Sequence, residues 1–482
     1  MQVQKTFLIY FDKYRSTIFV LVISVGILIL SWLLGYRVNR LPLMLIFGAT
    51  GGMVFILIAL KRMNTAITLL IASSATLPLT ISTGTATPLH FSMLVLALLT
   101  ILWIFRMGFI DKRIRLIPSP INLPFLGFVL TAMVSWLVGY VIWDWRIQIQ
   151  DNLFFVQLGQ FAIFAMSVAA LLLVSNHSID EKELKLWTAV LICMGVVTYL
   201  YWTFVRYGPP SPQMMGSVLM WPILLVWAQL MFNPKLKTWM HMGGILMTLL
   251  WAYWVYSKVL VWKGGWFPAV MGFFLLLFFK SRRVFFIVLI ILGLLVALNW
   301  EALGQYVVGP EIASGSTLRT LYWYDVIRMT SRSVLLGLGP ANYEFYWSDP
   351  TFIPLSRIAA GWDVWNEWGF SPPSHNSFVD IFSQTGLIGL IFFMWGLIAA
   401  LVICYRLLAK FKPGFQKAYI YAVMCGTISL AVASFWFADW LLPFVYNINI
   451  TGFAHTVYTW LLLGSVIALS NLSKGARDDQ DT

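Results

Sequence analysis

The chain has 482 residues, of which 60% are hydrophobic and only 11% are charged, and its formal net charge is +13. A water-soluble core of this length could not hide so much apolar surface, whereas a lipid bilayer solvates it directly. The composition therefore excludes a soluble enzyme and indicates an all-α, polytopic membrane protein.

Apolar runs of about 17–23 residues, the length that crosses a bilayer, recur along the chain with short polar connections between them. The first run has no small-residue cleavage site after it, so we expect an uncleaved first span. An even number of spans would leave both termini on the same side. We predict about fourteen transmembrane helices, at residues 17–35, 41–60, 64–82, 89–105, 121–143, 153–174, 186–205, 214–232, 239–256, 264–279, 284–299, 386–405, 418–438 and 451–471.

The basic residues gather at one end of these predicted spans. If the N-terminus is cytoplasmic, every inner connection is basic, and together the inner connections hold most of the 32 Lys and Arg residues. Cytoplasmic loops of membrane proteins carry this excess. The positive charge is therefore an orientation signal, and we expect no nucleic-acid partner.

The one long connection of this map, residues 300–385, faces outward. A long loop among short ones is where function concentrates. Within it, "GSTLRTLYWYDVIRMTSR" has the apolar spacing of an amphipathic helix at the membrane surface. We divide the chain into helices one to eleven (1–299), an extracytoplasmic catalytic loop (300–385), and helices twelve to fourteen with a cytoplasmic tail (386–482). The loop tryptophans fit either an interfacial aromatic belt or a sugar-binding platform: Trp323, Trp347, Trp362, Trp365 and Trp368.

Basic residues on the predicted outer side run against the charge bias, so each needs its own explanation. A Lys or Arg at a helix end often only extends to the lipid headgroups. An anion site is the alternative. Lys263 precedes Gly264 and Gly265 at the start of a span, where small residues admit a ligand and the helix N-terminus adds positive charge. Both interpretations stay open for the outer set, which is Arg37, Arg40, Arg146, Arg206, Lys258, Lys263, Arg319, Arg328, Arg332 and Arg357.

The segment "LRTLYWYDVIRMTSRSVLLGLGPANY", followed by "SHNSFVDIFSQTGLIGLIFF", resembles the O-antigen ligase and O-antigen polymerase superfamily. "WKGGW" is similar to the "S-R-G-x-W" of that superfamily, which places Lys263 at the first of two functional arginines. The likeness covers roughly residues 255–400. Three departures are Lys263 for Arg, Gln384 for Glu, and Ser331-Arg332-Ser333 for "H-P". The matching positions are Arg319, Trp323, Gly337, Gly339, Pro340, Asn342, His375, Asn376, Gly386 and Gly389.

The resemblance implies a GT-C-like membrane glycosyltransferase of the inner (cytoplasmic) membrane. Such an enzyme moves a glycan from an undecaprenyl-diphosphate donor to a sugar hydroxyl, with inversion and without a metal ion, on the periplasmic face. The acceptor is a lipid-linked glycan in a polymerase and lipid A-core in a ligase, and transfer to protein is also open. Fourteen spans favour the polymerase, for which a chain-length regulator is an expected partner besides membrane lipids.

Two other classes of protein compete with this one. A membrane transporter keeps ionisable groups or broken helices near mid-bilayer, and the predicted spans hold almost no charge there. Gln157 and Gln160 are the main interior polar residues. A structural subunit of an assembly is the third class.

The resemblance also implies roles for individual residues. A diphosphate leaving group carries about two negative charges, which fixed cations stabilise as the anomeric C–O bond breaks. We expect Arg319 and Lys263 to supply them, and His375 to act as the general base on the acceptor hydroxyl because its side chain titrates near neutral pH. Activity should then fall below the ordinary histidine pKa of about 6.5. The expected substrate-binding residues are Arg206, Asn376, Arg328 and Lys258.

Some of these assignments leave alternatives. Either Lys258 or Lys263 could be the second diphosphate-binding cation. If His375 instead binds the diphosphate, Asp325 and Glu344 are the next candidates for the base. The predicted outer loops contain no Asp-x-Asp pair and no His/Asp/Glu cluster with metal-ligand spacing, so we expect no metal ion and no cofactor.

Overall fold

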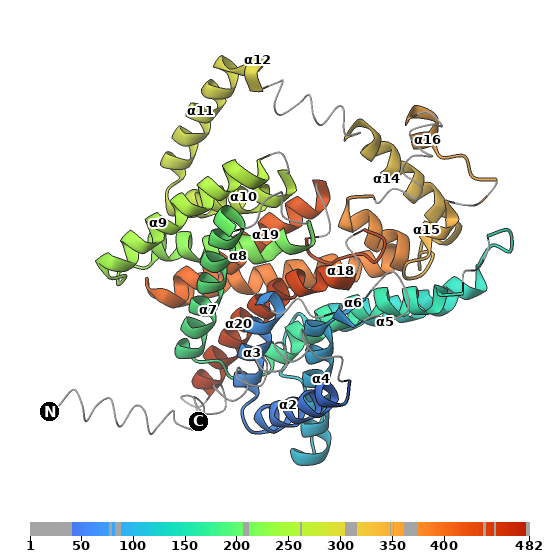
Figure 1. Ribbon diagram of the computed structural model, residues 1–482, viewed down its shortest axis with the longest axis horizontal. Helices are drawn as coiled ribbons and strands as arrows, with labels where there is room; N and C mark the ends of the chain where they lie inside the picture. Colours follow the sequence, from blue (N-terminus) through green and yellow to red (C-terminus); the bar gives the residue numbers. More distant parts are fainter. Residues whose placement is uncertain are drawn as a thin grey trace. The chain divides into compact units, whose positions relative to one another are not determined.

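A computed structural model of the protein describes residues 41–76, 80–81, 88–147, 149, 151–205, 212–260, 263–303, 316–347, 349, 351–360, 374–436, 440–447 and 450–478. Most of these residues are in helices (Figure 1). The two strands that accompany them, β1 (Thr80–Ile81) and β2 (Leu89–His90), pair antiparallel with Thr80 opposite His90. The prediction of an all-α membrane protein is confirmed.

The chain divides into two compact units. The first contains α2 (Leu41–Lys61), the start of α3 (Met63–Thr76), the end of α4 (Phe91–Phe105) and the π-helical turn η1 (Arg106–Ile110). The second unit contains the rest of α3 and α4 and all later elements. All candidate site residues belong to the second unit.

The transmembrane part of the second unit follows the predicted spans closely. Its helices are α5 (Asn122–Val141), α6 (Leu153–Ser175), α7 (Glu181–Leu200) with η2 (Tyr201–Val205), α8 (Pro212–Phe232), α9 (Thr238–Trp254) with η3 (Val255–Val259), α10 (Lys263–Lys280), α11 (Arg282–Leu298), α18 (Ser377–Lys410), α19 (Phe415–Trp436), and α20 (Phe453–Asp478), which follows η6 (Ile450–Gly452).

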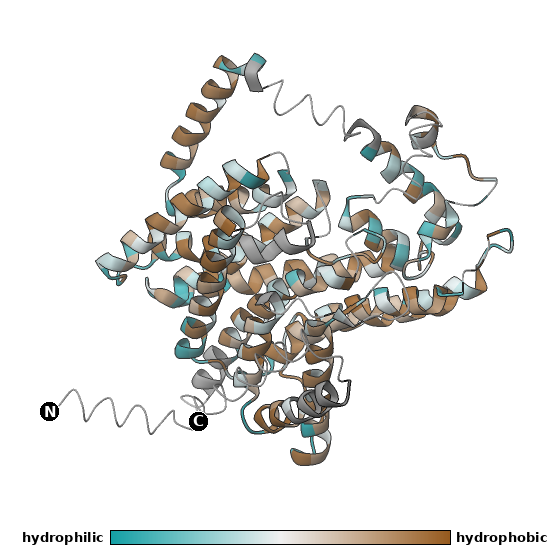
Figure 2. Cartoon of the chain, in the orientation of Figure 1, coloured by the Kyte–Doolittle hydropathy of each residue, from teal (hydrophilic) through white to brown (hydrophobic). Residues whose placement is uncertain are grey.

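Every span predicted after the first coincides with a helix, whereas the span at 17–35 lies outside the described residues. Within the described chain, eight helices are long and apolar enough to cross a membrane, and Figure 2 shows their hydrophobic residues in brown. Shorter apolar helices accompany them, such as Met220–Phe232. The multi-pass architecture is confirmed, and the number fourteen stays a prediction.

Burial separates central helices from peripheral ones. In α20, 94% of the most apolar 18-residue window is buried, and in α19 the share is 72%. These two helices pack with α6, α8 and α10. Helix α11 buries none of its residues, so its apolar side chains are left for the lipid. The centre of the unit therefore lies around α19 and α20.

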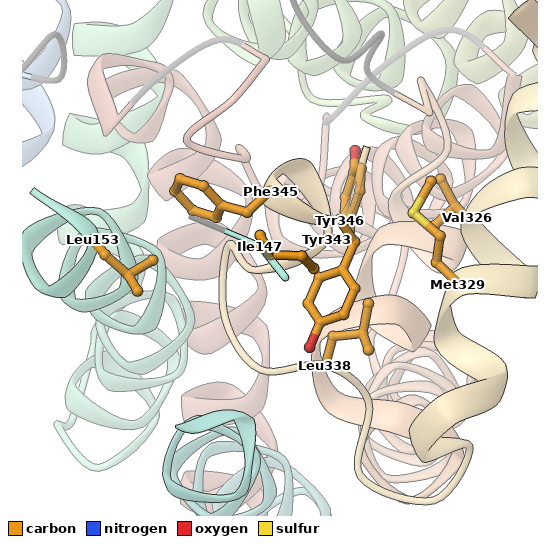
Figure 3. Close-up of a cluster of buried hydrophobic side chains, with 8 residues drawn as sticks. All are labelled: Ile147, Leu153, Val326, Met329, Leu338, Tyr343, Phe345 and Tyr346. Atoms are coloured by element: carbon orange, nitrogen blue, oxygen red, sulfur yellow. The ribbon is translucent and has the colours of Figure 1, made fainter. Parts of the chain in front are cut away.

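The predicted outer loop folds into short helices with a core of their own. They are α12 (Trp300–Leu303), α14 (Ser316–Thr330) with the turn η5 (Ser331–Ser333), α15 (Tyr343–Tyr346) and α16 (Leu355–Ala360). The expected helix is present as α14, with Val326 and Met329 buried and Ile327 exposed; its amphipathic character and its position at a membrane surface stay predictions. Figure 3 shows how its apolar face packs on α15 and on the connection between α5 and α6. The cluster consists of Ile147, Leu153, Val326, Met329, Leu338, Tyr343, Phe345 and Tyr346.

Helix α18 is broken at Gly386, where φ is +66°. The break frees the amide groups of Leu387 and Ile388, which donate to the carbonyls of Val334 (2.9 Å) and Leu335 (3.2 Å). A break at membrane depth persists only where such backbone groups find partners. A Cβ at residue 386 would lie 2.2 Å from the Leu335 oxygen, so only glycine fits.

The loop that fills this break is fixed by polar side chains. Gln384 accepts a hydrogen bond from the Ala341 amide (3.0 Å) and donates to the Tyr446 hydroxyl (2.8 Å). Asn342 accepts from Gln157 on α6 (2.6 Å). Gln157, in the interior of α6, therefore holds the outer loop. Gln384, at the position where Glu was expected, accepts one hydrogen bond with its amide oxygen and donates another with its amide nitrogen.

Candidate active site

His375 lies in a tight turn immediately before α18, with a left-handed φ of +54°. This conformation costs a non-glycine residue about 1–2 kcal/mol, so neighbouring bonds must hold it. Ser374 Oγ accepts from the Asn376 amide (3.0 Å) and donates to the Asn376 carbonyl (3.1 Å). Asn376 Oδ1 accepts from the first amides of α18, those of Phe378 (3.0 Å) and Val379 (3.2 Å). We call residues 374–376 the His375 turn.

Helix α14 supplies the cation beside this turn. Arg319 Nη1 donates to the carbonyl of Trp436 at the end of α19 (3.0 Å). One helical turn later, Trp323 Nε1 donates to the carbonyl of Ser374 (2.7 Å). Positions four apart share a helix face. The predicted base and the predicted cation are therefore brought together at one face of α14.

Burial and the nearby charge of Arg319 lower the pKa of His375 to about 4. The ring is half-buried, and its Nδ1 is buried without a hydrogen-bond partner in the part of the chain that the structure describes. A histidine with this pKa is neutral at physiological pH, as a proton acceptor must be. If His375 is the base, the expected fall in activity moves from about pH 6.5 to a lower pH, because burial disfavours the imidazolium.

Lys263 begins α10, which packs against α19. The Ser429 hydroxyl donates to the Pro268 carbonyl, and Leu224 of α8 lies against both Gly272 and Gly426, so the two helices run antiparallel. Lys263 precedes Pro268 by five residues and Trp436 follows Ser429 by seven, which places them about 7 and 10 Å further out along the helices. Lys263 and the carbonyl that holds Arg319 thus lie at the same end of this helix pair.

Lys258 lies in the π-helical turn η3, which contacts α10. It is half-buried. The two lysines therefore belong to neighbouring helix ends, and the choice between them as second cation stays open. Arg206, the other predicted cation of this region, lies outside the described residues.

Arg328 is not brought to the His375 turn. It follows Arg319 by nine positions, about two and a half helical turns, and so points to the opposite side of α14. Its Nη2 donates to the Ile353 carbonyl (2.5 Å), and its guanidinium lies 4.2 Å from the centre of the Phe352 ring. Its substrate-binding role stays a prediction, and these contacts give it a structural role within the loop.

Asp325, a reserve candidate for the base, is fully buried. Its carboxylate accepts from the amides of Leu355 and Ser356 (both 2.9 Å) and from the Ser356 hydroxyl (2.7 Å). Asp325 therefore caps α16. Glu344, the second reserve, is half-buried on α15.

Four charged residues of the α5–α6 connection and the outer loop form a cluster that we call the outer clasp. They are Asp144, Arg146, Arg332 and Asp349. Arg332 donates to Asp144 Oδ2 (2.9 Å) and to Asp349 Oδ2 (2.5 Å), and Arg146 donates to Asp144 Oδ1 (2.9 Å). Hydrogen bonds from Arg146, with the charges of both arginines, hold the pKa of Asp144 well below its usual range. The clasp ties the α5–α6 connection to the outer loop, so Arg146 and Arg332 are ion-paired rather than extended to lipid.

Asp380 is a residue of this region that sequence reasoning missed. It is fully buried in the first turn of α18. The polar groups that face it are the hydroxyls of Ser374, Tyr446 and Tyr343. The available signal was an acidic residue five positions after His375 in an otherwise apolar helix.

No group of three or more His, Cys, Asp or Glu side chains that could hold a metal ion occurs among the residues that the structure describes. The expectation of a metal-free reaction stays a prediction.

Residues 263–394 match a family model described as O-antigen ligase. The matched segment runs from Lys263 through Arg319 and the glycine-bearing loop to His375 and the break in α18, which are the parts that the geometry connects. A comparison with curated proteins found none that matches the chain.

Proposed function

We propose, from the match of residues 263–394 to a family model described as O-antigen ligase, that this membrane protein is an inverting, metal-independent glycosyltransferase. It would take a glycan from undecaprenyl diphosphate and pass it to a sugar hydroxyl on the outer face of the cytoplasmic membrane. The lipid-linked donor and a lipid A-core or lipid-linked glycan acceptor follow from the family.

The observation that carries this proposal is a neutral histidine beside a cation that has no carboxylate partner among the described residues. Arg319 donates to a backbone carbonyl, whereas Arg332 in the same loop is paired with two aspartates. An arginine without a counter-ion at the membrane surface favours a polyanion as its ligand. A buried, neutral imidazole favours proton abstraction.

The proposed reaction can be written in full with these residues. His375 accepts the proton of the acceptor hydroxyl while that oxygen bonds to the anomeric carbon from the face opposite the diphosphate. The anomeric C–O bond to the diphosphate breaks, and the developing charge is stabilised by Arg319 with Lys263 or Lys258. Because Nδ1 of His375 is buried, Nε2 is the nitrogen that we assign to the acceptor. A later proton loss to water restores the base.

Two observations point to different acceptors. The family's description as O-antigen ligase favours lipid A-core, and the predicted number of spans favours the polymerase reaction on a second lipid-linked glycan. The proposed polymerase would work with a chain-length regulator, and the proposed ligase would not need one.

Purified protein in nanodiscs with radiolabelled lipid-linked glycan tests the proposal. Parallel reactions would contain unlabelled lipid-linked glycan, lipid A-core or an acceptor protein, with His375→Ala as the inactive control. Longer lipid-linked chains identify a polymerase, and labelled lipid A-core identifies a ligase. Absence of transfer in all three, together with solute flux into liposomes, would instead identify a transporter.

A further inference from the structure

Trp323 connects the two halves of the candidate site. Its indole Nε1 donates to the Ser374 carbonyl in the His375 turn. Its ring packs against Phe435 and Trp436 at the end of α19, with centroid distances of 5.4 and 5.9 Å. Arg319, on the same face of α14, bonds to the carbonyl of that Trp436. Trp323 thus contacts both the His375 turn and Trp436, whose carbonyl accepts the hydrogen bond of Arg319.

The His375 turn needs an external hold on one side only. On its C-terminal side, Asn376 caps α18, so this end is fixed by the helix itself. The bonds between Ser374 and Asn376 close the turn internally. On the N-terminal side, the indole bond to Ser374 is the tie to another element that we find in the described chain. The left-handed φ of His375 persists only where the surroundings over-determine it.

We propose that Trp323 is a positioning residue, which holds the His375 turn at a fixed offset from Arg319 through its indole N–H. The inference rests on the proposed function. In that reaction His375 acts on the attacking hydroxyl and Arg319 acts on the departing diphosphate. The acceptor oxygen, the anomeric carbon and the diphosphate oxygen must lie nearly in line. A misplacement of about 1 Å can cost about a hundredfold in rate.

A purely structural tryptophan would act through its ring, as in an interfacial aromatic belt. The two roles separate when the N–H is removed and the ring is kept. Replacement of Trp323 by 3-benzothienylalanine does this, since sulfur replaces the indole N–H in a ring of nearly the same size. Trp323→Phe is the simpler variant, and Trp347→Phe is the matched control because Trp347 packs on Phe352 within the loop.

The test compares kcat, the donor KM and the pH profile of glycan transfer in these variants. We expect the benzothienyl variant to lose about tenfold in kcat, the effect of one hydrogen bond on alignment, with donor KM changed less than twofold because Arg319 keeps its anchor. The acid limb of the profile should move from about pH 4 towards 6.5, because a loosened turn admits water to the ring. The ionisable groups near the turn, Arg319 and Asp380, are present in the wild type and in every variant, so their titration is common to all profiles. Trp347→Phe should match the wild type.

Each other outcome has a distinct meaning. If the benzothienyl variant matches the wild type in kcat and pH profile, Trp323 acts through packing alone and the inference is wrong. If kcat and melting temperature fall together with no movement of the acid limb, the role is structural and the inference is again wrong. If the wild type transfers no glycan, the proposed function fails before Trp323 is tested.

Discussion

Arg319 and Arg332 belong to the same outer loop, yet their surroundings are opposite in kind. Arg332 lies in the outer clasp, where two aspartates accept its hydrogen bonds and Arg146 completes the cluster. In the part of the chain that the structure describes, Arg319 donates a hydrogen bond to a neutral carbonyl and has a half-buried histidine beside it. Within the described residues, the arginine of the clasp is neutralised by aspartates, whereas Arg319, which lies beside His375, has no carboxylate partner. Arg328 also bonds to a carbonyl, but it lies on the opposite side of α14 from Arg319.

The resemblance singles out Arg319 rather than Arg332, but residue type and local sequence do not show which arginine has carboxylate partners. Asp144, one partner of Arg332, lies 188 positions earlier in the chain. Arg319 precedes and Arg332 follows the same run of aromatic and apolar residues, and extension to lipid headgroups was an open interpretation for both. The partner, which decides the role, is visible only once the chain is folded.

The largest effect should come from removing the unneutralised charge. Arg319→Ala should reduce transfer by at least about 10²–10³, the typical loss for one donor that stabilises a developing anion, while the protein stays folded. Arg319→Lys should recover little, because an ammonium cannot match two phosphate oxygens as a guanidinium does. Transfer assays beside melting curves make the measurement. Normal glycan transfer by Arg319→Ala would show that this charge has no part in catalysis.

Breaking the clasp should affect stability rather than chemistry. Arg332→Ala leaves the fully buried Asp349 side chain without its nearest donor, which we expect to cost about 1–3 kcal/mol of unfolding free energy. The double variant Arg332→Ala/Asp349→Ala should recover part of that loss, as a double-mutant cycle would show. The folded fraction should keep near-normal kcat. A large loss of kcat in fully folded Arg332→Ala would place the clasp in the active site.

Both His375 and the outer clasp should keep their neutral-pH states to lower pH than ordinary histidine and aspartate pKa values suggest. His375 has a lowered pKa of about 4, so its neutral, active form should persist as the pH falls from 7 to about 5. The pKa of Asp144 is also lowered, so its contribution to stability is complete above the unfolded pKa of about 3.9 and is lost as the pH falls through the folded value. We predict an acid limb of kcat/KM near pH 4, with the clasp intact above it. A limb near 6.5 would mean that the ring is solvated.

The smallest expected effect is that of a chelator. Purified enzyme should transfer glycan at an unchanged rate in EDTA, because arginine and lysine side chains are proposed to stabilise the diphosphate. Added Mg²⁺ or Mn²⁺ should likewise leave the rate within error. A strict requirement for either ion would contradict the metal-free reaction.

Helix positions could be predicted from sequence because hydropathy and length alone determine them. The spans at 121–143 and 153–174 became α5 and α6 with small shifts at their ends. The break in α18 was not foreseen: the predicted span began at residue 386, after the polar Ser383-Gln384-Thr385, whereas α18 begins at Ser377 and is interrupted at Gly386. Only the carbonyls of Val334 and Leu335, supplied from another segment, make that break stable.

Site residues were predictable only as far as their chemistry was unusual for their place. A histidine before a membrane helix and an arginine on the outer side stood out, and the structure places His375 and Arg319 together. Asp325 stood out equally, yet it caps α16. The role of Trp323 was missed because a hydrogen bond to a distant carbonyl leaves no pattern in the sequence. Asp380 was missed although an acidic residue in an apolar helix was visible, because its burial beside the His375 turn appears only in the fold.

Donor binding measured separately from transfer tests the central claim most directly. Tritiated undecaprenyl-diphosphate glycan would be titrated against the wild type, His375→Ala and Arg319→Ala, with Arg332→Ala as the folded control. Our account predicts that His375→Ala binds donor as the wild type does while its transfer rate falls by about 10²–10⁴, and that Arg319→Ala binds donor weakly. Equal loss of donor affinity in both variants would contradict the account, because His375 would then be a diphosphate ligand rather than the base.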